Sequence, residues 1–270
     1  MSLTSGTKPS MTTLLDTLIH AARLGGAVVM RHYEAGVEAH EKSDGSPVTL
    51  ADTQAEAAIL AQLALDHPGV PTVGEETGAS PGAGSGTFFL IDPLDGTREF
   101  IGRNGEFTVN IALIEHGEPV AGVVLAPAMG RLFAGARGAG AFEIMADGSR
   151  RPLRVRASPP APVVLGSRSH ATPETRLWLE RFPGHGAEPC GSSVKFGRLA
   201  AGEADLYPRL GPTMEWDTAA GDAVLRAAGG LTVTLEGEPL RYGRAGGDWR
   251  NPHFIAYGDP ALAARCRSAA

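Results

Sequence analysis

The sequence Asp92-Pro93-Leu94-Asp95-Gly96-Thr97 follows the apolar run Phe88–Ile91, and this stretch says most about the fold and the site. A short run of bulky apolar residues bounded by turn-forming residues indicates a buried strand. Pro93 has a fixed φ and no N–H group to donate, and Gly96 permits a sharp turn. We therefore expect a buried strand that ends in two carboxylates, those of Asp92 and Asp95.

The carbonyl oxygen of Leu94 can point the same way as both carboxylates. Oxygen ligands of this kind suit a hard cation such as Mg²⁺ or Mn²⁺ better than zinc. The N–H groups of Gly96 and Thr97 would open a short helix, where a phosphate group could sit. The competing interpretation is an ordinary strand-to-turn junction in which an aspartate caps a helix. The strand before the motif and the Gly-Thr pair after it favour the metal site.

Two further acidic clusters could complete such a site. Gly74-Glu75-Glu76-Thr77 follows a short apolar run, and Glu215-Trp216-Asp217-Thr218 opens an expected helix. Taken alone, each cluster is typical of a solvated loop end or a helix N-cap, and Asp217 could simply interact with the positive end of its helix. The metal-site hypothesis therefore requires that the three clusters meet in space.

Helical and strand periodicities divide the chain into an antiparallel first half and an alternating second half, joined by the Ser/Pro/Ala-rich linker Ala157–Pro162. The first half is expected to contain the helices Thr12–Glu34 and Leu50–Asp66 and the strands Val70–Val73, Phe88–Ile91, Phe107–Glu115, Val120–Leu125, Leu132–Gly135, Ala141–Ile144 and Leu153–Val155. The second half is expected to contain the strands Val163–Gly166, Asp205–Pro208 and Leu231–Leu235 and the helices Pro173–Phe182, Ser193–Ala201 and Asp217–Ala228. We expect layered helices and sheets in which residues 11–157 and 158–270 form one functional unit, after a disordered tail or cloning remnant at residues 1–10.

Composition narrows the class of function. With 270 residues, 43% of them hydrophobic, the chain can form one or two compact domains. A net charge of −6 without a basic block argues against a nucleic-acid partner. Because the chain is acidic, an anionic substrate would need a metal ion to mediate its binding. Cys190 and Cys266 lie far apart, which argues against a disulfide framework and favours the reducing cytoplasm. Neither a membrane-span-length apolar run, nor a secretory pattern, nor a Walker, GxGxxG, GxSxG or HExxH motif occurs.

The three acidic clusters resemble, in order, the three signatures of the inositol monophosphatase superfamily, the third being Trp216-Asp217-Thr218-Ala219-Ala220-Gly221. The resemblance extends from Leu14 to Tyr257. It implies the five-layered αβαβα sandwich of inositol monophosphatases and fructose-1,6-bisphosphatases. It also implies a magnesium-dependent, lithium-sensitive phosphomonoesterase.

Within this superfamily, the flanking sequences resemble those of the CysQ-type 3′(2′),5′-bisphosphate nucleotidases. The resembling segments are Arg98–Ile101, Arg103–Asn110, Ser167–His170, Gly191–Phe196 and Tyr207–Thr213. The implied substrate is adenosine 3′,5′-bisphosphate, which would be converted to AMP and phosphate in connection with sulfur assimilation.

The resemblance also implies roles for individual residues. Two or three Mg²⁺ ions, which Mn²⁺ can replace, would be bound by Glu75, Asp92, the Leu94 carbonyl, Asp95 and Asp217. A metal-activated water would attack phosphorus directly, oriented by Glu75 and by Thr97 with its partner Asp52. The residues implied to contact the substrate are Gly96, Thr97, His170, Gly191, Ser192, Lys195 and Asp217. Without the resemblance, Asp52 and Lys195 would be interpreted as solvated helix charges and His170 as a turn residue.

Two alternatives to this function stay open. Glu215 matches an acidic position that contacts inositol hydroxyls in inositol monophosphatases, so inositol 1-phosphate or another sugar phosphate is a second candidate substrate. A non-catalytic role as a binding partner of RNA or the transcription machinery is the other, and the acidic ligand set and the missing basic patch argue against it. The enzyme is expected to be a cytoplasmic monomer or homodimer, with peripheral membrane association left open.

Overall fold

The computed structural model describes residues 10–36, 40–41, 47–167, 172–180, 182, 184–243 and 247–268. Of the expected tail at residues 1–10, only Ser10 belongs to this part, where its hydroxyl accepts the N–H of Thr13 and caps the first helix. His170, one of the expected substrate contacts, lies outside the described residues.

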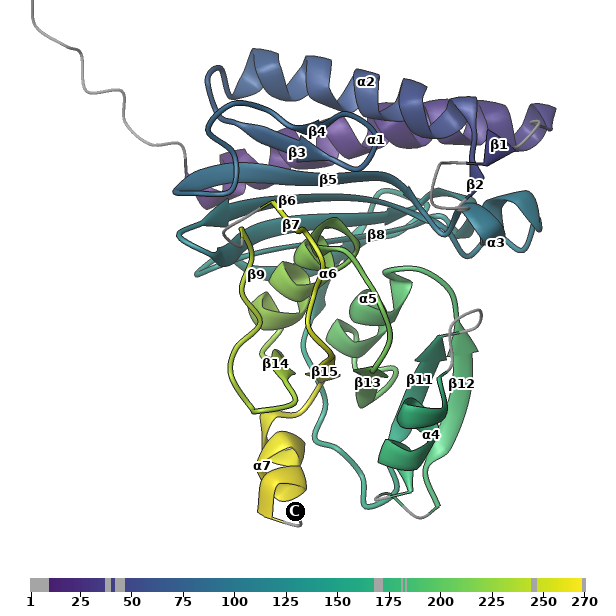
Figure 1. The fold of residues 1–270 in the computed structure, drawn as a ribbon, viewed down its shortest axis with the longest axis vertical. Coiled ribbons are helices and arrows are strands. Elements are labelled where there is room, and N and C mark those ends of the chain that lie inside the picture. The colour runs from purple at the N-terminus through teal and green to yellow at the C-terminus, as the bar shows by residue number, and fades with distance from the viewer. Residues whose placement is uncertain are drawn as a thin grey trace, which may run out of the picture.

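The described elements form five layers in the order αβαβα (Figure 1). Helices α1 (Met11–Ala35) and α2 (Leu50–Asp66) cover the outer face of a large sheet. Helices α5 (Val194–Ala200) and α6 (Glu215–Ala227) lie between this sheet and a smaller one. The outer face of the smaller sheet carries residues of α4 (Pro173–Leu179) and α7 (Pro260–Ser268) in one hydrophobic cluster. The expected layered sandwich is confirmed.

The large sheet has the strand order β10-β9-β8-β7-β6-β5-β3-β4 within the described residues. Its strands are β3 (Thr72–Gly74), β4 (Gly78–Ala79), β5 (Thr87–Asp95), β6 (Thr108–Glu115), β7 (Glu118–Ala126), β8 (Arg131–Ala136), β9 (Gly140–Ile144) and β10 (Arg150–Leu153). The pairs are antiparallel except for β3 and β5, which run parallel. Because β3 and β5 run parallel, their carboxyl ends lie at the same edge of the sheet, which is where the Glu75 and Asp92 clusters begin.

The small sheet has the order β12-β11-β13-β15-β14. Its strands are β11 (Val163–Ser167), β12 (Gly186–Cys190), β13 (Leu206–Arg209), β14 (Leu231–Thr234) and β15 (Phe254–Tyr257). Three short elements complete the described fold, namely the hairpin β1 (His40–Glu41) and β2 (Pro47–Val48), the helix α3 (Thr97–Ile101) and the 3₁₀ turn η1 (Pro127–Met129). Residues 154–162 connect the last strand of the large sheet to the first strand of the small one.

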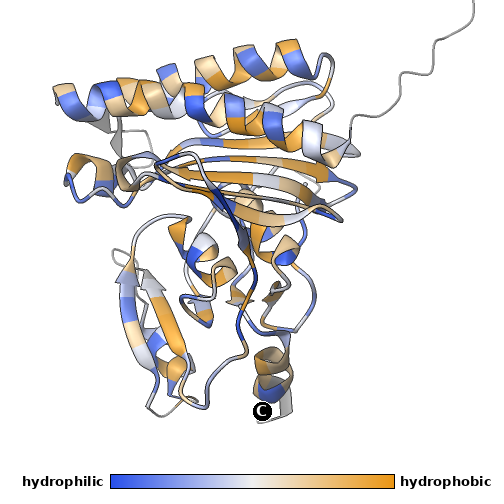
Figure 2. Ribbon diagram, turned by 180° about the vertical axis from the view of Figure 1, so that it is seen from behind, coloured by the Kyte–Doolittle hydropathy of each residue, from blue (hydrophilic) through white to orange (hydrophobic). Residues whose placement is uncertain are grey.

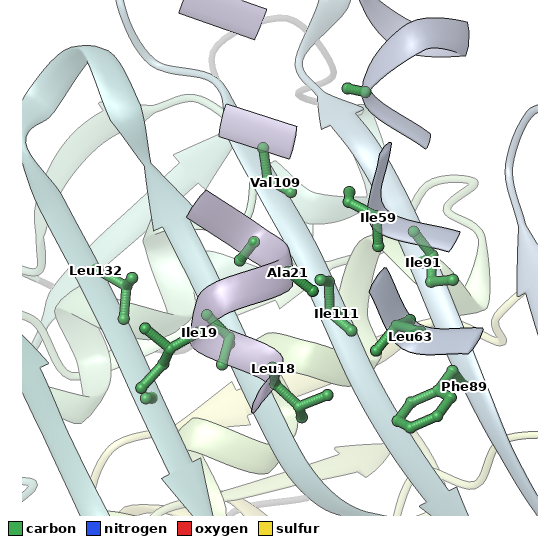
Figure 3. Close-up of a cluster of buried hydrophobic side chains, with 14 of the residues drawn as sticks. Leu18, Ile19, Ala21, Ile59, Leu63, Phe89, Ile91, Val109, Ile111 and Leu132 are labelled. Atoms are coloured by element: carbon green, nitrogen blue, oxygen red, sulfur yellow. The ribbon is translucent and has the colours of Figure 1, made fainter. Parts of the chain in front are cut away.

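The core of the large sheet explains why its strands are continuously apolar. Helices cover both faces, so every residue of β6 is buried. On the outer face, Leu18 of α1 and Ile59 of α2 pack with Ile111 of β6 (Figure 3). On the inner face, α6 lies so close to β7 that a Cβ atom at Gly122 would come within 2.9 Å of the Ala220 Cα atom. Figure 2 shows the hydrophobic strands between helices of mixed hydropathy.

Helix α1 has the length and composition of a membrane span, but 56% of its most apolar window is buried inside the protein. Its apolar residues pack on α2 and the large sheet, so it serves as a core helix here.

Several expected boundaries were wrong. The strand expected at Leu153–Val155 ends at Leu153, the helix expected at Pro173–Phe182 ends at Leu179, and the helix expected from Asp217 begins at Glu215. β12, β15 and α7 were not predicted. β12 has the sequence Gly-Ala-Glu-Pro-Cys, which is poor in strand-forming residues, and it forms because an edge strand needs a partner on one side only.

Candidate active site

A cavity of about 290 Å³ lies where the carboxyl end of β5 meets the turn after β3 and the starts of α5 and α6. Its lining includes ten of the twelve expected site residues: Glu75, Asp92, Leu94, Asp95, Gly96, Thr97, Gly191, Ser192, Lys195 and Asp217. The structure therefore brings the three acidic clusters together, as the metal-site hypothesis requires. Of the other two expected residues, Asp52 contacts Thr97 and His170 lies outside the described residues.

The end of β5 is irregular where it delivers its carboxylates. Asp92 pairs with Asn110 and Asp95 with Thr108, and the register shifts between these two pairs. Pro93, which has no N–H group for the ladder, lies in this irregularity. Asp92 is 1% exposed, and its Oδ1 accepts the Leu94 N–H at 3.0 Å. Its Oδ2 is buried and has no hydrogen-bond partner in the described part of the chain, so it is available to a ligand.

Gly96 turns the chain directly after Asp95. Its φ of +92° lies in the left-handed region, and an added Cβ atom would come within 3.1 Å of the Glu106 carbonyl oxygen. Both constraints require glycine. The turn leads into α3, whose first residue, Thr97, faces the cavity.

Asp52 lies behind Thr97 in the first turn of α2. Its Oδ2 accepts the N–H and the hydroxyl of Thr49, both at 2.8 Å, which closes a capping box. Its Oδ1 lies 3.3 Å from the hydroxyl of Thr97. Asp52 is 1% exposed, so the interpretation of this residue as a solvated helix charge was wrong.

Glu75 reaches the cavity through the parallel pairing of β3 with β5. Its N–H donates to the carbonyl oxygen of Ile91, the residue that precedes Asp92. Asp217 reaches it from the first turn of α6, where its Oδ2 accepts the Met214 N–H at 2.9 Å. Asp217 therefore caps its helix and lines the cavity, so the two interpretations of this residue are compatible.

The carboxylates raise one another's pKa. Burial, then Glu75, Asp95 and Asp217, raise the pKa of Asp92 well above that of a free aspartate. Burial, then Asp95 and Glu75, raise the pKa of Asp217 in the same way. Burial also raises the pKa of Asp95, against the opposing effect of Lys195. A cation would relieve this repulsion, and the hard oxygen donors fit Mg²⁺.

Within the described residues, no three His, Cys, Asp or Glu side chains already form a finished ligand set around one point. The carboxylates and the Leu94 carbonyl that line the cavity are the oxygen donors that would hold such an ion.

Lys195 lies beneath the turn that carries Gly191 and Ser192. Its ammonium donates to the carbonyl oxygens of Cys190 at 3.2 Å and Ser192 at 2.5 Å, and it lies 5.0 Å from the centre of the Tyr207 ring. Ser192 has a φ of +42°, which is strained for a residue with a side chain. Lys195 is 4% exposed, so it is not a solvated charge, and it holds this strained turn against the cavity.

Sequence reasoning missed Arg209 and Ser193. Arg209 at the end of β13 lines the cavity and is 8% exposed; its Nη2 donates to the Pro212 carbonyl oxygen, while its Nε has no hydrogen-bond partner among the described residues. Arg209 directly follows the expected strand Asp205–Pro208 and lies in the resembling segment Tyr207–Thr213, which was the available signal. Ser193 lies in the resembling segment Gly191–Phe196, but its contacts come from distant parts of the chain and could not be seen in the sequence.

Glu215 does not line the cavity. It is fully buried, and its Oε2 accepts the Gly243 N–H at 2.6 Å. Its carboxylate therefore supports a loop, which argues against the hypothesis that Glu215 contacts sugar hydroxyls.

Known proteins of similar sequence and fold include phosphatases and nucleotidases. The chain is 44% identical over 233 residues to the 3′(2′),5′-bisphosphate nucleotidase CysQ of Escherichia coli K12, which covers 85% of this chain and 94% of that protein. It is 38% identical to the protein of the same name from Buchnera aphidicola, over 85% and 87% of the two chains.

Among solved structures, CysQ from Bacteroides thetaiotaomicron superposes with a TM-score of 0.79 at 35% identity, over 91% of this chain and 97% of that one. An inositol monophosphatase from Anabaena superposes with a TM-score of 0.75 at 26% identity, over 96% of each chain. Because the Inositol monophosphatase family profile matches residues 10–267, this chain belongs to the inositol monophosphatase family.

Proposed function

We propose that the protein is a Mg²⁺-dependent phosphomonoesterase of the 3′(2′),5′-bisphosphate nucleotidase type that converts adenosine 3′,5′-bisphosphate to AMP and phosphate. The observation that carries the proposal is one cavity lined by four mutually repelling carboxylates and by a buried arginine whose Nε–H has no hydrogen-bond partner among the described residues. The 44% identity to a protein named as such a nucleotidase supports the substrate class.

The metal site would be formed by Glu75, Asp92, the Leu94 carbonyl, Asp95 and Asp217, which together would hold two or three Mg²⁺ ions, with Mn²⁺ as a substitute. When bound, Mg²⁺ lowers the pKa of water and neutralises charge on the transferred phosphoryl group. The orphaned Oδ2 of Asp92 supports this assignment.

Thr97 and Asp52 would orient the attacking water. The Thr97 hydroxyl can donate to Asp52 Oδ1 or to the Leu94 carbonyl oxygen, each at 3.3 Å. Either bond commits the hydroxyl proton, so the Thr97 oxygen presents its lone pairs to a water in the cavity. Glu75, which also lines the cavity, would accept a hydrogen bond from the other O–H group of that water. The N–H groups of Gly96 and Thr97 would bind oxygens of the transferred phosphoryl group.

The second phosphate of the substrate needs a positive partner away from the carboxylates. Arg209 supplies a cation on the cavity wall, and its Nε–H has no hydrogen-bond partner in the part of the chain that the structure describes. Lys195 contributes charge, since it opposes the rise in the pKa of Asp95, and it holds Gly191 and Ser192 in place. A monophosphate such as inositol 1-phosphate would leave Arg209 without its ligand.

Phosphate release from adenosine 3′,5′-bisphosphate, inositol 1-phosphate and fructose 1,6-bisphosphate, each with Mg²⁺ or with excess chelator, tests the proposal. We expect the nucleotide to have the highest kcat/KM and chelator to abolish its turnover. A preference for inositol phosphate, or full turnover in chelator, would overturn the proposal.

We also propose that the enzyme acts in the cytoplasm as a monomer or homodimer on this small molecule, without a nucleic-acid partner. The chain has only two cysteines, Cys190 and Cys266, which lie far apart in the sequence, and this supports a reducing compartment. Residues 11–157 and 158–270 would act as one functional unit, because both contribute to the cavity lining.

A further inference from the structure

Glu56 is a buried acidic residue that the proposed chemistry does not use. It lies one helical turn after Asp52 in α2 and is fully buried, and it does not line the cavity. Its Oε2 accepts the Glu76 N–H at 3.0 Å, and its Oε1 accepts the Thr77 N–H at 2.8 Å. Both carboxylate oxygens therefore bind the turn that carries Glu75.

Gly74 shows how closely the carboxylate fits this turn. A Cβ atom at Gly74 would lie 2.5 Å from Cδ of Glu56 and 2.6 Å from its Oε2. The Glu56 carboxylate thus contacts the backbone immediately before Glu75 and binds the two N–H groups immediately after it. Glu75 itself is held on the other side by its N–H bond to Ile91 of β5.

This arrangement is more than a means of filling the core. A buried carboxylate carries a large desolvation cost, which a hydrophobic side chain of similar volume would avoid. Within the part of the chain that the structure describes, no Lys, Arg or His forms an ion pair with Glu56. Two charge-assisted bonds to one turn offset the cost, and they fix that turn.

Helix α2 contacts the site through two residues, Asp52 and Glu56, which are four positions apart. Residues four apart lie on one helix face, so Asp52 and Glu56 point the same way. Asp52 binds the hydroxyl of Thr97, and Glu56 binds the turn of Glu75. α2 therefore holds two separate parts of the site in a fixed relation to one another.

We propose that Glu56 is a positioning residue for the metal site, which sets the orientation of Glu75 through the backbone of the 74–77 turn. The inference rests on the proposed function, in which Glu75 is a metal ligand. Loss of the Glu56 carboxylate would free the turn, so that ion binding would have to order it. Residues that hold metal ligands in place typically contribute about 10- to 100-fold to metal affinity.

The test is calorimetric titration of Mg²⁺ into the wild type and into Glu56→Gln, with thermal unfolding of each in chelator. Glutamine keeps the shape but presents an N–H₂ group to one of the two backbone N–H groups. We expect the Kd for Mg²⁺ to rise about tenfold, with a matching rise in the Mg²⁺ concentration for half-maximal rate. The KM for the nucleotide at saturating Mg²⁺ should stay unchanged, because Glu56 does not line the cavity.

Glu115→Gln is the matched control. Glu115 is also a buried glutamate, but it lies in β6, forms an ion pair with Arg137 and pairs with Thr87 at the opposite end of β5 from Asp95. This control should bind Mg²⁺ like the wild type even if its melting temperature falls. Gly74→Ala, which displaces the Glu56 carboxylate without removing it, should raise the Kd as Glu56→Gln does and replaces that variant if it fails to fold.

The outcomes separate the two proposals. An unchanged Kd in Glu56→Gln or in Gly74→Ala, with a lowered melting temperature, would overturn the positioning role and leave the proposed function intact. A wild type that binds no Mg²⁺ would overturn both. An equal rise in Glu115→Gln would show a general loss of stability and would also overturn the positioning role.

Discussion

The hydroxyl of Ser193 lies 2.7 Å from Oδ2 of Asp95, although the two residues are 98 positions apart in the chain. The same hydroxyl lies 2.5 Å from the carbonyl oxygen of Asp217 and accepts the side-chain amide of Asn110 at 3.1 Å. One proton serves the carboxylate or the carbonyl. Ser193, at the start of α5, therefore links three elements through one hydroxyl: β6 at Asn110, the end of β5 at Asp95 and the first turn of α6 at Asp217.

Ser193→Ala should remove the hydrogen bonds of this hydroxyl without removing a proposed metal ligand. It leaves the Asn110 amide and the Asp95 carboxylate each short of one bond, so we expect a loss of about 1–3 kcal/mol in the free energy of unfolding. The rate should fall about tenfold as Asp95 loses its support. Denaturant unfolding and steady-state kinetics measure both effects, with Ser149→Ala in the exposed 147–149 turn as the control. Wild-type kinetics in Ser193→Ala would show that Asp95 needs no such support.

Asp95→Asn should abolish turnover and leave the fold intact. The change removes a charge from the metal site and keeps the shape of the side chain. Because burial raises the pKa of Asp95, the neutral amide should leave the metal-free protein at least as stable as the wild type. Phosphate release and melting in chelator measure this pair of effects. Near-normal turnover would contradict the ligand assignment, and a large drop in melting temperature would point to a structural role.

Thr97→Ala should lower kcat by roughly 100-fold, with a much smaller change in Mg²⁺ affinity, because Thr97 is assigned to the water. Thr97→Ser keeps the hydroxyl beside Asp52 and should retain most of the activity. Rates at saturating Mg²⁺ and calorimetric Mg²⁺ titration distinguish the two effects. Equal activity in the alanine and serine variants would remove the hydroxyl from the mechanism.

Arg209→Gln should raise the KM for adenosine 3′,5′-bisphosphate by roughly 10- to 100-fold, since a charge-assisted contact is worth about 1.5–3 kcal/mol. The KM for a simple monophosphate such as inositol 1-phosphate should change little. The ratio of the two KM values is therefore the measurement. Losses of similar size on both substrates would place Arg209 in the support of the cavity wall, through its bond to the Pro212 carbonyl oxygen.

Stability without metal should depend on pH through Asp92 and Asp217. Their raised pKa values mean that the native state binds more protons than the unfolded chain, whose aspartates titrate near pH 4. The contribution of these two groups to metal-free stability should therefore be largest below about pH 4 and should fall as the pH rises from there toward the raised values. Mg²⁺ relieves the repulsion, so the difference in Tm between Mg²⁺ and chelator should widen as the pH rises above about pH 4. A difference that stays constant or narrows would contradict this account.

The sequence predicted the parts of the site that lie in short motifs. Gly96 and the Asp92 and Asp95 carboxylates follow from local turn chemistry, and the resemblance added Asp52, which periodicity alone would have left in solvent. What could not be predicted depends on contacts between distant segments. Glu215 has the residue type of a ligand, and only the position of Gly243 shows that its carboxylate binds a loop instead.

Contacts between distant segments also determine the roles of residues that the sequence did not single out. Ser193 gains its meaning from Asp95 and Asp217, and Glu56 from the 74–77 turn, and none of these pairings leaves a periodic pattern. Arg209 was also missed, although an arginine at the end of a buried strand is unusual enough to flag.

The close packing of α6 on β7 has a consequence for how this enzyme tolerates change. Gly122 lets the backbone of Ala220 approach the sheet directly, and the same helix carries Asp217 in its first turn. The distance between Asp217 and the aspartates of β5 therefore depends on how closely the α6 backbone packs on β7 at Gly122, which does not line the cavity. One methyl group added at Gly122 would wedge the helix away from the sheet. A mutational survey confined to the residues that line the cavity would overlook Gly122. A survey of the whole chain should find that activity tolerates substitution at Gly122 as poorly as at the proposed metal ligands.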